Sequence, residues 1–417
     1  MRFQEYSIDE AIKRNLDSMG FKRPTDIQFK SIPPILRNED VLAIAQTGTG
    51  KTAAFAIPII HLIQERKRKL RTSGIQCIVM VPTRELALQI TKVFNQLEKG
   101  TRVTSISIFG GVEQDPQIKK LLEGVDILVA TPGRVFDLQH QGFIRLSNTA
   151  ILVLDEADQM LDLGFIQDIR DLGRYLPKER QTLFFSATIN DEIKKLAYSL
   201  VTNPIRIQIA PKDRVSKNID HSKFFVSAEE KRFFLERIIK EHPDKKIIVF
   251  VRTKVRAERV AKAMERASID TLTLHGNKDQ KERITVLDKF RNGVIKVLIA
   301  TDVTARGIDI PNVDYVVNYD LPDVAENYVH RVGRTGRGTQ HGIAISFCSE
   351  EENDLLAEIE DFLTKPIVEI KIDLSDYKKT IDFTDDATTY DINILMKEIE
   401  DFETTQKKKI KSKKIKK

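Results

Sequence analysis

Short apolar segments of roughly strand length recur along the chain, and stretches with helical periodicity separate them. In the first half these segments are VLAIA, IQCIVMV, VTSISIF, DILVAT, AILVLD, TLFFSAT and IRIQI. Several are nearly continuous Val, Ile and Leu, which is typical of parallel strands that helices cover on both faces. Between them, TRELALQITKVFNQLEKG repeats apolar residues at three- and four-residue spacing and predicts an amphipathic helix.

The alternation stops near Ala210, where the polar segment PKDRVSKNID is typical of a flexible linker. It restarts with SKFFVS, KKIIVFV, IDTLTLH, IKVLIAT, VDYVVNY and GIAISFC, and it is lost from about Lys365. The pattern predicts two α/β domains, each a doubly wound parallel sheet, joined by this linker. The predicted limits are 1–209 for the first domain, 210–218 for the linker, 219–370 for the second domain, and 371–417 for an acidic stretch and a lysine-rich, disordered tail.

The composition of the 417 residues, with 41% hydrophobic and 31% charged, is typical of a soluble globular protein. No apolar run approaches the ~20 residues that span a bilayer, and the opening MRFQEYSIDE lacks a signal-peptide pattern. Cys77 and Cys348 lie in apolar runs without partners at metal-ligand spacing, so we expect buried thiols in a reducing compartment. These features predict a cytoplasmic protein with no membrane partner.

Positive charge is concentrated at the C-terminal end. The formal net charge is +6, but the last eleven residues, KKKIKSKKIKK, hold eight lysines and no acids. Without them the basic count falls from 67 to 59 against 61 acidic residues, so the body is near −2. Such a tail is either a solvated extension or a phosphate-binding arm for a polyanion, and both interpretations stay open here.

The segment AQTGTGKT follows the first predicted strand and opens a predicted helix. Small residues let backbone N–H groups point at phosphate oxygens, and the helix N-terminus adds its dipole. Lys51 can reach the β- and γ-phosphates of a nucleotide, and the Thr52 hydroxyl can ligate Mg²⁺. Ala45 stands where the strict pattern has glycine, and a chance glycine turn is the alternative. The predicted nucleotide-binding residues of this loop are Thr47, Gly48, Thr49, Gly50, Lys51 and Thr52.

The strand AILVL ends in Asp155-Glu156-Ala157-Asp158. A carboxylate at the tip of a buried strand is where a phosphate-loop enzyme holds its metal ion, so Asp155 is predicted to bind Mg²⁺. Glu156 beside it can orient or deprotonate an attacking water molecule. The alternative is an acidic helix N-terminus, which favours Asp and Glu in any protein.

Together GTGKT, DEAD, SAT and HRVGRTGR resemble the motifs of the DEAD-box RNA helicases of superfamily 2, in the order typical of that family. The resemblance runs from about Phe3 to about residue 350. It implies two tandem RecA-like domains, with ATP and Mg²⁺ as cofactors and RNA as partner. It also implies RNA-stimulated ATP hydrolysis, coupled to closure of the domains on the RNA backbone and to local unwinding of short duplexes or remodelling of RNA–protein complexes.

The resemblance assigns roles around the nucleotide. Phe21 can stack on a base and the Gln28 amide can pair with the edge of adenine, which together would select ATP. Asp309 would face the nucleotide sugar. Phosphoryl transfer spreads charge over the γ-phosphate oxygens, and an arginine supplied across an interface stabilises that charge. The catalytic residues that the resemblance implies in the second domain are the arginine fingers Arg334 and Arg337, and His330, which would contact the DEAD loop.

Loops at strand ends resemble the RNA-contact motifs of the family and offer hydroxyls, backbone N–H groups and arginines, which bind phosphates without distinguishing bases. The implied RNA-binding residues are Pro82, Thr83, Arg84, Gly110, Gly111, Thr131, Pro132, Gly133, Arg134, Arg283, Thr301, Arg306 and Gly307. The residues implied to couple RNA binding to hydrolysis are Ser186 and Thr188. Taken one by one, PTREL is also a helix start with Thr83 as N-cap, and GG is also a simple turn.

Two other functions fit paired domains of this kind. One is a DNA helicase or translocase, against which the DEAD, PTRELA and TPGR motifs argue. The other is an ATP-timed clamp on RNA that does not unwind duplexes. A compact core with a short basic extension resembles the small bacterial proteins of the RhlE type, and ribosomal and RNA-decay assemblies are candidate partners.

Overall fold

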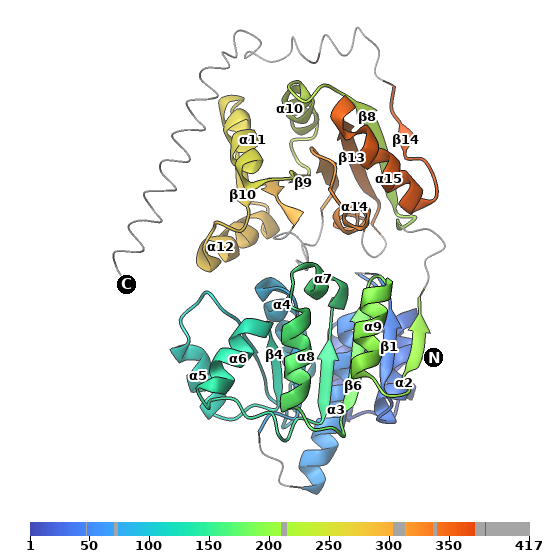
Figure 1. Ribbon diagram of the computed structural model, residues 1–417, viewed down its shortest axis with the longest axis vertical. Coiled ribbons are helices and arrows are strands. Elements are labelled where there is room, and N and C mark those ends of the chain that lie inside the picture. The colour runs from blue at the N-terminus through green and yellow to red at the C-terminus, as the bar shows by residue number, and fades with distance from the viewer. Residues whose placement is uncertain are drawn as a thin grey trace.

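The computed structural model describes residues 1–46, 48–70, 74–209, 215–302, 313–336, 340–371 and 380. Figure 1 shows two α/β domains, one above the other, each with helices on both faces of a central sheet. Each sheet has seven strands, and every pair of neighbouring strands is parallel. The predicted fold class is therefore confirmed.

In the first domain the strand order is β3-β4-β2-β5-β6-β1-β7. The strands are β1 (Val41–Ile44), β2 (Cys77–Met80), β3 (Ser105–Ile108), β4 (Ile127–Ala130), β5 (Ile151–Leu154), β6 (Gln181–Ser186) and β7 (Ile205–Gln208). The helices are η1 (Phe3–Glu5), α1 (Glu10–Ser18), α2 (Asp26–Leu36), α3 (Lys51–Lys69), α4 (Arg84–Leu97), α5 (Asp115–Leu122), α6 (Pro132–His140), α7 (Ala157–Asp162), α8 (Ile166–Tyr175) and α9 (Asp191–Leu200).

In the second domain the order is β10-β11-β9-β12-β13-β8-β14, which repeats the order of the first sheet strand for strand. The strands are β8 (Ile219–Phe225), β9 (Ile247–Phe250), β10 (Thr271–Leu274), β11 (Val297–Ala300), β12 (Tyr315–Asn318), β13 (Gly342–Cys348) and β14 (Val368–Glu369). The helices are α10 (Lys231–Glu241), α11 (Lys254–Arg266), α12 (Gln280–Arg291), α14 (Ala325–Val332), η2 (Glu350–Glu352) and α15 (Asn353–Leu363).

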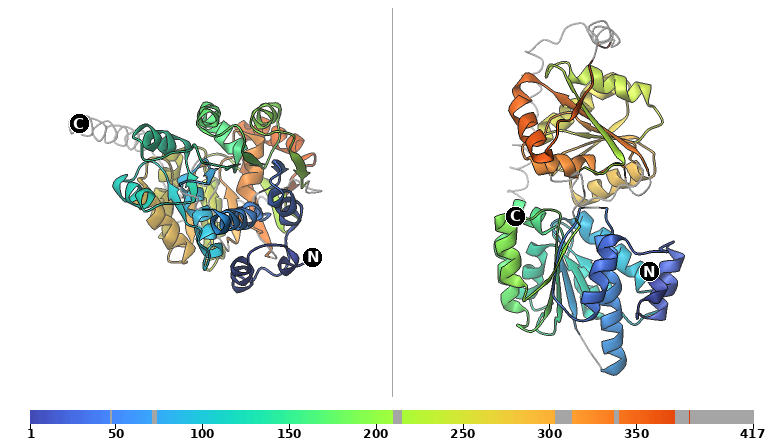
Figure 2. Two further views of the ribbon diagram at one scale, coloured as in Figure 1. Left: turned by 90° about the horizontal axis from the view of Figure 1, so that it is seen from below. Right: turned by 90° about the vertical axis from the view of Figure 1, so that its right-hand side faces the viewer.

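The near-continuous apolar strands fill a core on each side of their sheet. Along β2, Cys77 and Val79 belong to the cluster beneath α1 to α4, whereas Ile78 and Met80 belong to the cluster beneath α5 to α9. This division follows from the two-residue repeat of a strand, which turns successive side chains to opposite faces. Figure 2 shows helices on both sides of each sheet. Cys77 and Cys348 are free, buried thiols, as predicted.

The predicted strand segments all contain strands, with two departures. β8 begins at Ile219, before the predicted segment SKFFVS, and the prediction that regular structure stops near Lys365 misses β14. β14 spans two residues at the edge of the sheet, and Val368 is 69% exposed. A strand this short and exposed has no buried apolar run from which it could be predicted. Among the described residues, no helix combines the length and apolarity needed to cross a membrane.

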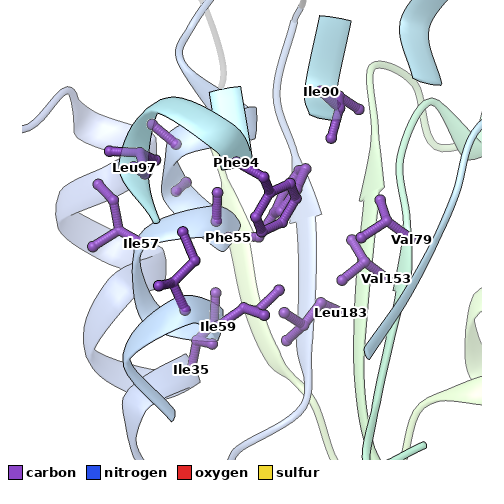
Figure 3. Close-up of a cluster of buried hydrophobic side chains, with 14 of the residues drawn as sticks. Ile35, Phe55, Ile57, Ile59, Val79, Ile90, Phe94, Leu97, Val153 and Leu183 are labelled. Atoms are coloured by element: carbon purple, nitrogen blue, oxygen red, sulfur yellow. The ribbon is translucent and has the colours of Figure 1, made fainter. Parts of the chain in front are cut away.

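Phe55 lies at the centre of one core of the first domain, with Phe94 and Phe185 beside it (Figure 3). Replacing Phe55 with Ala is expected to lower the free energy of unfolding by about 3–5 kcal/mol, because the ring leaves a cavity that its neighbours cannot fill. Urea denaturation followed by circular dichroism measures this change. Phe29→Ala is the control, since Phe29 is 50% exposed. Equal losses in the two variants would contradict the core described here.

Candidate active site and nucleic-acid interface

The carboxyl ends of the first sheet carry two groups of loops. The loops after β1, β5 and β6, which are neighbouring strands, hold the segment ending in GKT, the DEAD acids and SAT. The loops after β3, β4 and β2, at the other side of the sheet, hold the GG, TPGR and PTRE segments. In open parallel sheets ligands bind at this edge, so the strand order alone separates one candidate site from the other.

Lys51 is the first residue of α3, directly after Gly50, which adopts a left-handed backbone with φ of 93°. Its side chain is buried, and its ammonium nitrogen has no hydrogen-bond partner among the described residues. The Thr49 hydroxyl donates to the Gln46 carbonyl oxygen at 2.7 Å and closes the turn. A buried ammonium without a partner at a helix start is suited to an anionic ligand, because it is costly to leave unpaired.

The DEAD acids lie close to Lys51. Burial raises the pKa of Asp155, and burial raises that of Glu156 to about 7, with the positive charge of Lys51 opposing both shifts. Asp155 accepts a hydrogen bond from the Glu156 backbone N–H at 3.0 Å, and Glu156 has a left-handed φ of 53°. A glutamate with a pKa near 7 is matched to proton transfer at neutral pH.

Gln28 is buried against the phosphate-loop segment. Its amide oxygen accepts from the Thr25 backbone N–H at 2.9 Å, and its amide nitrogen donates to the Gly50 carbonyl oxygen at 3.1 Å. A Cβ atom at Gly50 would lie 2.6 Å from that nitrogen, so a larger residue does not fit there. Phe21 packs edge-on against the buried Phe3, with ring centroids 6.3 Å apart.

Asp158, the last acid of the DEAD sequence, holds the SAT segment. One of its carboxylate oxygens accepts from the backbone N–H groups of Ala187 and Thr188, both at 3.0 Å, and from the Thr188 hydroxyl at 3.2 Å. Ser186 is fully buried at the end of β6. No separate role for Asp158 could be predicted from the sequence, because its partners lie about 30 residues further along the chain.

Three arginines gather at the second group of loops. Arg84 starts α4, Arg134 lies in α6, and Arg283 comes from α12 of the second domain. Burial lowers the pKa of Arg84, and the positive charges of Arg283 and Arg134 lower it further, against the effect of Glu85. Buried N–H groups of Arg134 and Arg283 lack hydrogen-bond partners among the described residues. Like charges with unpaired donors in one place predict an anion-binding site.

Thr83 has the local role that the simpler interpretation of PTREL predicted. The Thr83 hydroxyl oxygen accepts from the Leu86 backbone N–H at 3.3 Å as the N-cap of α4. Thr131 is the N-cap residue of α6, and Pro132 starts that helix. Gly111 has a φ of 75°, and a Cβ atom there would lie 2.2 Å from Arg84 Nη1. Gly110 and Gly133 have open space where a Cβ atom would be.

The two domains touch through Glu85, a buried residue of the PTREL segment that is not among the predicted site residues. Glu85 Oε1 pairs with Arg283 Nη2 at 2.8 Å and accepts from the Gln280 amide at 3.2 Å. On the other side of the interface, the buried Arg334 lies close enough to Glu156 to oppose the rise of its pKa. The Arg334 Nε donates to the His330 carbonyl oxygen at 3.0 Å.

For the other predicted residues the structure gives burial, backbone conformation or position in an element. Thr301 is buried at the end of β11. Gly48 has a left-handed φ of 82°, and Thr52 follows Lys51 in α3. The predicted residues that lie outside the described residues are Thr47, Arg306, Gly307, Asp309 and Arg337.

Comparisons with known proteins identify the family. A model of DEAD/DEAH box helicases matches residues 25–196, and a model of the helicase conserved C-terminal domain matches residues 230–339. The chain is 40% identical over 360 residues to the DEAD-box ATP-dependent RNA helicase CshA of Geobacillus kaustophilus, covering 86% of this chain and 76% of that protein. The chain belongs to the DEAD-box helicase family.

A second relative in this family is the ATP-dependent RNA helicase RhlB of Shewanella woodyi, 42% identical over 372 residues, which cover 88% of this chain and 84% of that protein. These relatives are of the CshA and RhlB types, so the likeness to RhlE-type proteins stays a prediction. Among solved structures, S. cerevisiae Dbp5 bound to RNA and ADP BeF3 is 32% identical with a TM-score of 0.81, covering 91% of this chain and 99% of that one.

The same yeast protein has a second solved structure that resembles this chain less. A variant of Dbp5 bound to Nup159, Gle1, IP6 and ADP has a TM-score of 0.61, at 30% identity, with 90% and 99% of the two chains covered. The structure of this DEAD-box protein is therefore more similar to that of Dbp5 bound to RNA and ADP BeF3.

Asp158→Ala is expected to lower the free energy of unfolding by about 1–2 kcal/mol, because three donors of the SAT segment lose one charged acceptor. Asp158→Asn keeps an acceptor oxygen and is expected to lose less. Chemical denaturation of both variants measures the difference. Equal stability of the wild type and the Ala variant would contradict this role of Asp158.

Proposed function

We propose that this chain is an ATP-dependent RNA helicase. It hydrolyses ATP when RNA is bound, and it couples hydrolysis to closure of its domains and to local unwinding of short duplexes or remodelling of RNA–protein complexes. The observation that carries the proposal is that the second domain completes both groups of loops of the first. The positive charge of Arg334 acts on Glu156 at one group, and Arg283 pairs with Glu85 at the other.

We place the nucleotide phosphates between Gly50 and the Lys51 ammonium. This ammonium is buried without a hydrogen-bond partner among the described residues, so an anion that binds there would stabilise it. Asp155 and the Thr52 hydroxyl would hold Mg²⁺, since hard oxygen ligands of this kind suit that ion. Mg²⁺ would neutralise charge on the β- and γ-phosphates. Glu156 would accept a proton from the attacking water, and its pKa of about 7 supports that role.

The second domain would supply the charge that the transition state needs. Arg334 is buried near Glu156 at the interface, which supports its role as an arginine finger. Arg337 and His330 are proposed by resemblance to the family, as is the contact of Asp309 with the sugar. Phe21 and Gln28 would bind adenine. Gln28 also fixes Gly50, so the base site and the phosphate site are linked by a hydrogen bond.

RNA would bind along the second group of loops and continue onto α12. Arg84, Arg134 and Arg283 offer charge and N–H groups suited to phosphate oxygens, and they offer no arrangement specific to a base. Sequence preference should therefore be weak. The other residues proposed for the RNA backbone are Pro82, Thr83, Gly110, Gly111, Thr131, Pro132, Gly133, Thr301, Arg306 and Gly307.

Because ATP and RNA each bridge the domains, each would favour the closed arrangement for the other. Ser186 and Thr188 are proposed to link the two sites, and the hydrogen bonds from Thr188 to Asp158 support this role. We also propose the limits 1–209, 210–218, 219–370 and 371–417 for the domains, linker and tail. We also propose a cytoplasmic location, which the two free thiols support because they suit a reducing compartment. The proposed partners are ribosomal or RNA-decay assemblies.

The deciding measurement is the ATPase rate without nucleic acid, with single-stranded RNA and with single-stranded DNA of equal length. RNA is expected to raise the rate about tenfold or more, and DNA to raise it little. Equal stimulation by DNA would favour a general nucleic-acid translocase, and no stimulation would contradict the proposal. Displacement of a short RNA duplex then separates a helicase from an RNA clamp.

Gly111→Ala tests the RNA path. A Cβ atom there collides with the Arg84 guanidinium, so RNA affinity is expected to fall about tenfold through loss of one charged contact. Gly124→Ala is the matched control, because Gly124 also has positive φ, 91°, but nothing lies within 4 Å of its Cβ position. Fluorescence anisotropy of labelled RNA with a non-hydrolysable ATP analogue measures both. A similar RNA affinity in the two variants would contradict the proposed contact between Arg84 and RNA.

A further inference from the structure

The second domain repeats the first even where no nucleotide is expected to bind. Since the two sheets have the same order, β8 corresponds to β1, and the helix after each begins with a lysine: α10 at Lys231 and α3 at Lys51. Both lysines are buried, with 1% and 6% of their surface exposed. The glycine-rich turn is replaced by Ser-Ala-Glu-Glu in the second domain. Lys231 therefore occupies the place of a phosphate-binding lysine without the loop that holds a phosphate.

A carboxylate of the chain fills this place. Glu352 is 4% exposed and one of its oxygens pairs with the Lys231 ammonium. The same oxygen accepts from the backbone N–H of Ser349 at 3.2 Å and from its hydroxyl at 3.3 Å. The other oxygen accepts from Arg252 Nη2 at 2.8 Å and from the Leu321 backbone N–H at 2.9 Å. Five donors therefore surround one buried carboxylate, and hydrogen bonds of this charge-assisted kind are the strong ones.

One branch of this network leads to the interdomain contact. Arg252 lies in the turn between β9 and α11, and Lys254, the first residue of α11, donates to the Asn277 side chain at 3.1 Å. Asn277 lies in the loop that precedes α12, the helix whose Arg283 pairs with Glu85 of the first domain. Contacts through Arg252, Lys254 and Asn277 thus link Glu352 to α12 on the RNA side of the interface.

The other branch leads to the proposed arginine finger. The Leu321 backbone N–H, which donates to Glu352, lies between β12 and α14. α14 carries His330 and ends directly before the turn that contains Arg334. Arg331 of this helix donates to the carbonyl oxygen of Asp320, the residue before Leu321, at 2.6 Å. The segment that Glu352 fixes is therefore the segment from which the finger helix starts.

We infer that Glu352 is a positioning residue that couples the RNA side of the second domain to its arginine finger. Its carboxylate takes the place that a phosphate holds in the first domain, and it fixes the turn after β9 and the turn before α14 relative to each other. The inference rests on the proposed function. A cavity of about 370 Å³ lies beside the network. Residues that line it include Lys231, Arg252, Arg256, Asp320 and Glu352.

Glu352→Gln tests this role in the full chain, with Glu360→Gln as matched control. Glu360 also pairs with a lysine, Lys223 at 2.7 Å, and accepts from a backbone N–H, that of Ile367 at 2.7 Å, but it contacts neither turn. At saturating ATP and RNA, Glu352→Gln is expected to lower kcat about tenfold, within the usual range of coupling between sites. The RNA concentration at half-maximal rate and the affinity for nucleotide without RNA should stay within about twofold.

The control should keep kcat within about twofold while its melting temperature falls as much as that of Glu352→Gln. Equal losses of kcat in the two variants, or a loss of melting temperature alone, would overturn the inference. If Glu352→Gln does not fold, Arg252→Ala breaks one branch at a partly exposed side chain, and an unchanged kcat then overturns the inference. If both fold, the double variant should lose no more kcat than Glu352→Gln. The wild type in the same assay tests the proposed function separately, because it must respond to RNA.

Discussion

Closure of this protein depends on bringing positive charges together. Arg84, Arg134 and Arg283 meet where the two domains touch, and Glu85 is the carboxylate buried among them. Glu85 pairs with Arg283, and the exposed Asp137 lies 4.0 Å from Arg134, so positive charge stays in excess at this place. In the proposed function, RNA phosphates would complete the charge balance. The same feature makes contact between the domains sensitive to salt.

On the nucleotide side of the sheet, negative groups outnumber positive ones, because two buried carboxylates lie near one lysine. Asp155 and Glu156 are buried carboxylates whose charged forms are disfavoured, and the ammonium of Lys51 lies near them without a hydrogen-bond partner among the described residues. The lysine makes no hydrogen bond to these acids among the described residues, and its charge does not fully offset the effect of burial on their pKa values. In the proposed function, a nucleotide with a divalent cation would supply a partner of opposite charge to the lysine and to the acids at once. The two groups of loops at the carboxyl ends of one sheet thus lack charges of opposite sign, and the strand order places them on different halves of the sheet.

The sequence was sufficient for the fold and for the local motifs, because both are encoded in short stretches. Buried parallel strands appear as apolar runs, and a phosphate loop is a strand, a glycine turn and a helix start. The charged residues that organise the interior escaped prediction: Glu85, Asp158 and Glu352. Each acts on partners about 30 to about 200 residues away, and only the folded sheet order brings them together. β14 escaped for a different reason, since two exposed residues carry no pattern.

The hydrogen bond from Gln28 to the Gly50 carbonyl oxygen has a consequence for how substrates are discriminated. Gly50 is the N-cap of α3, so its position sets the direction of the helix start that carries Lys51. If Gln28 binds the base as proposed, a base that displaces Gln28 would also move that helix start. Selection among nucleotides would then take effect as misalignment of the phosphates, and a wrong base would lower turnover as well as occupancy.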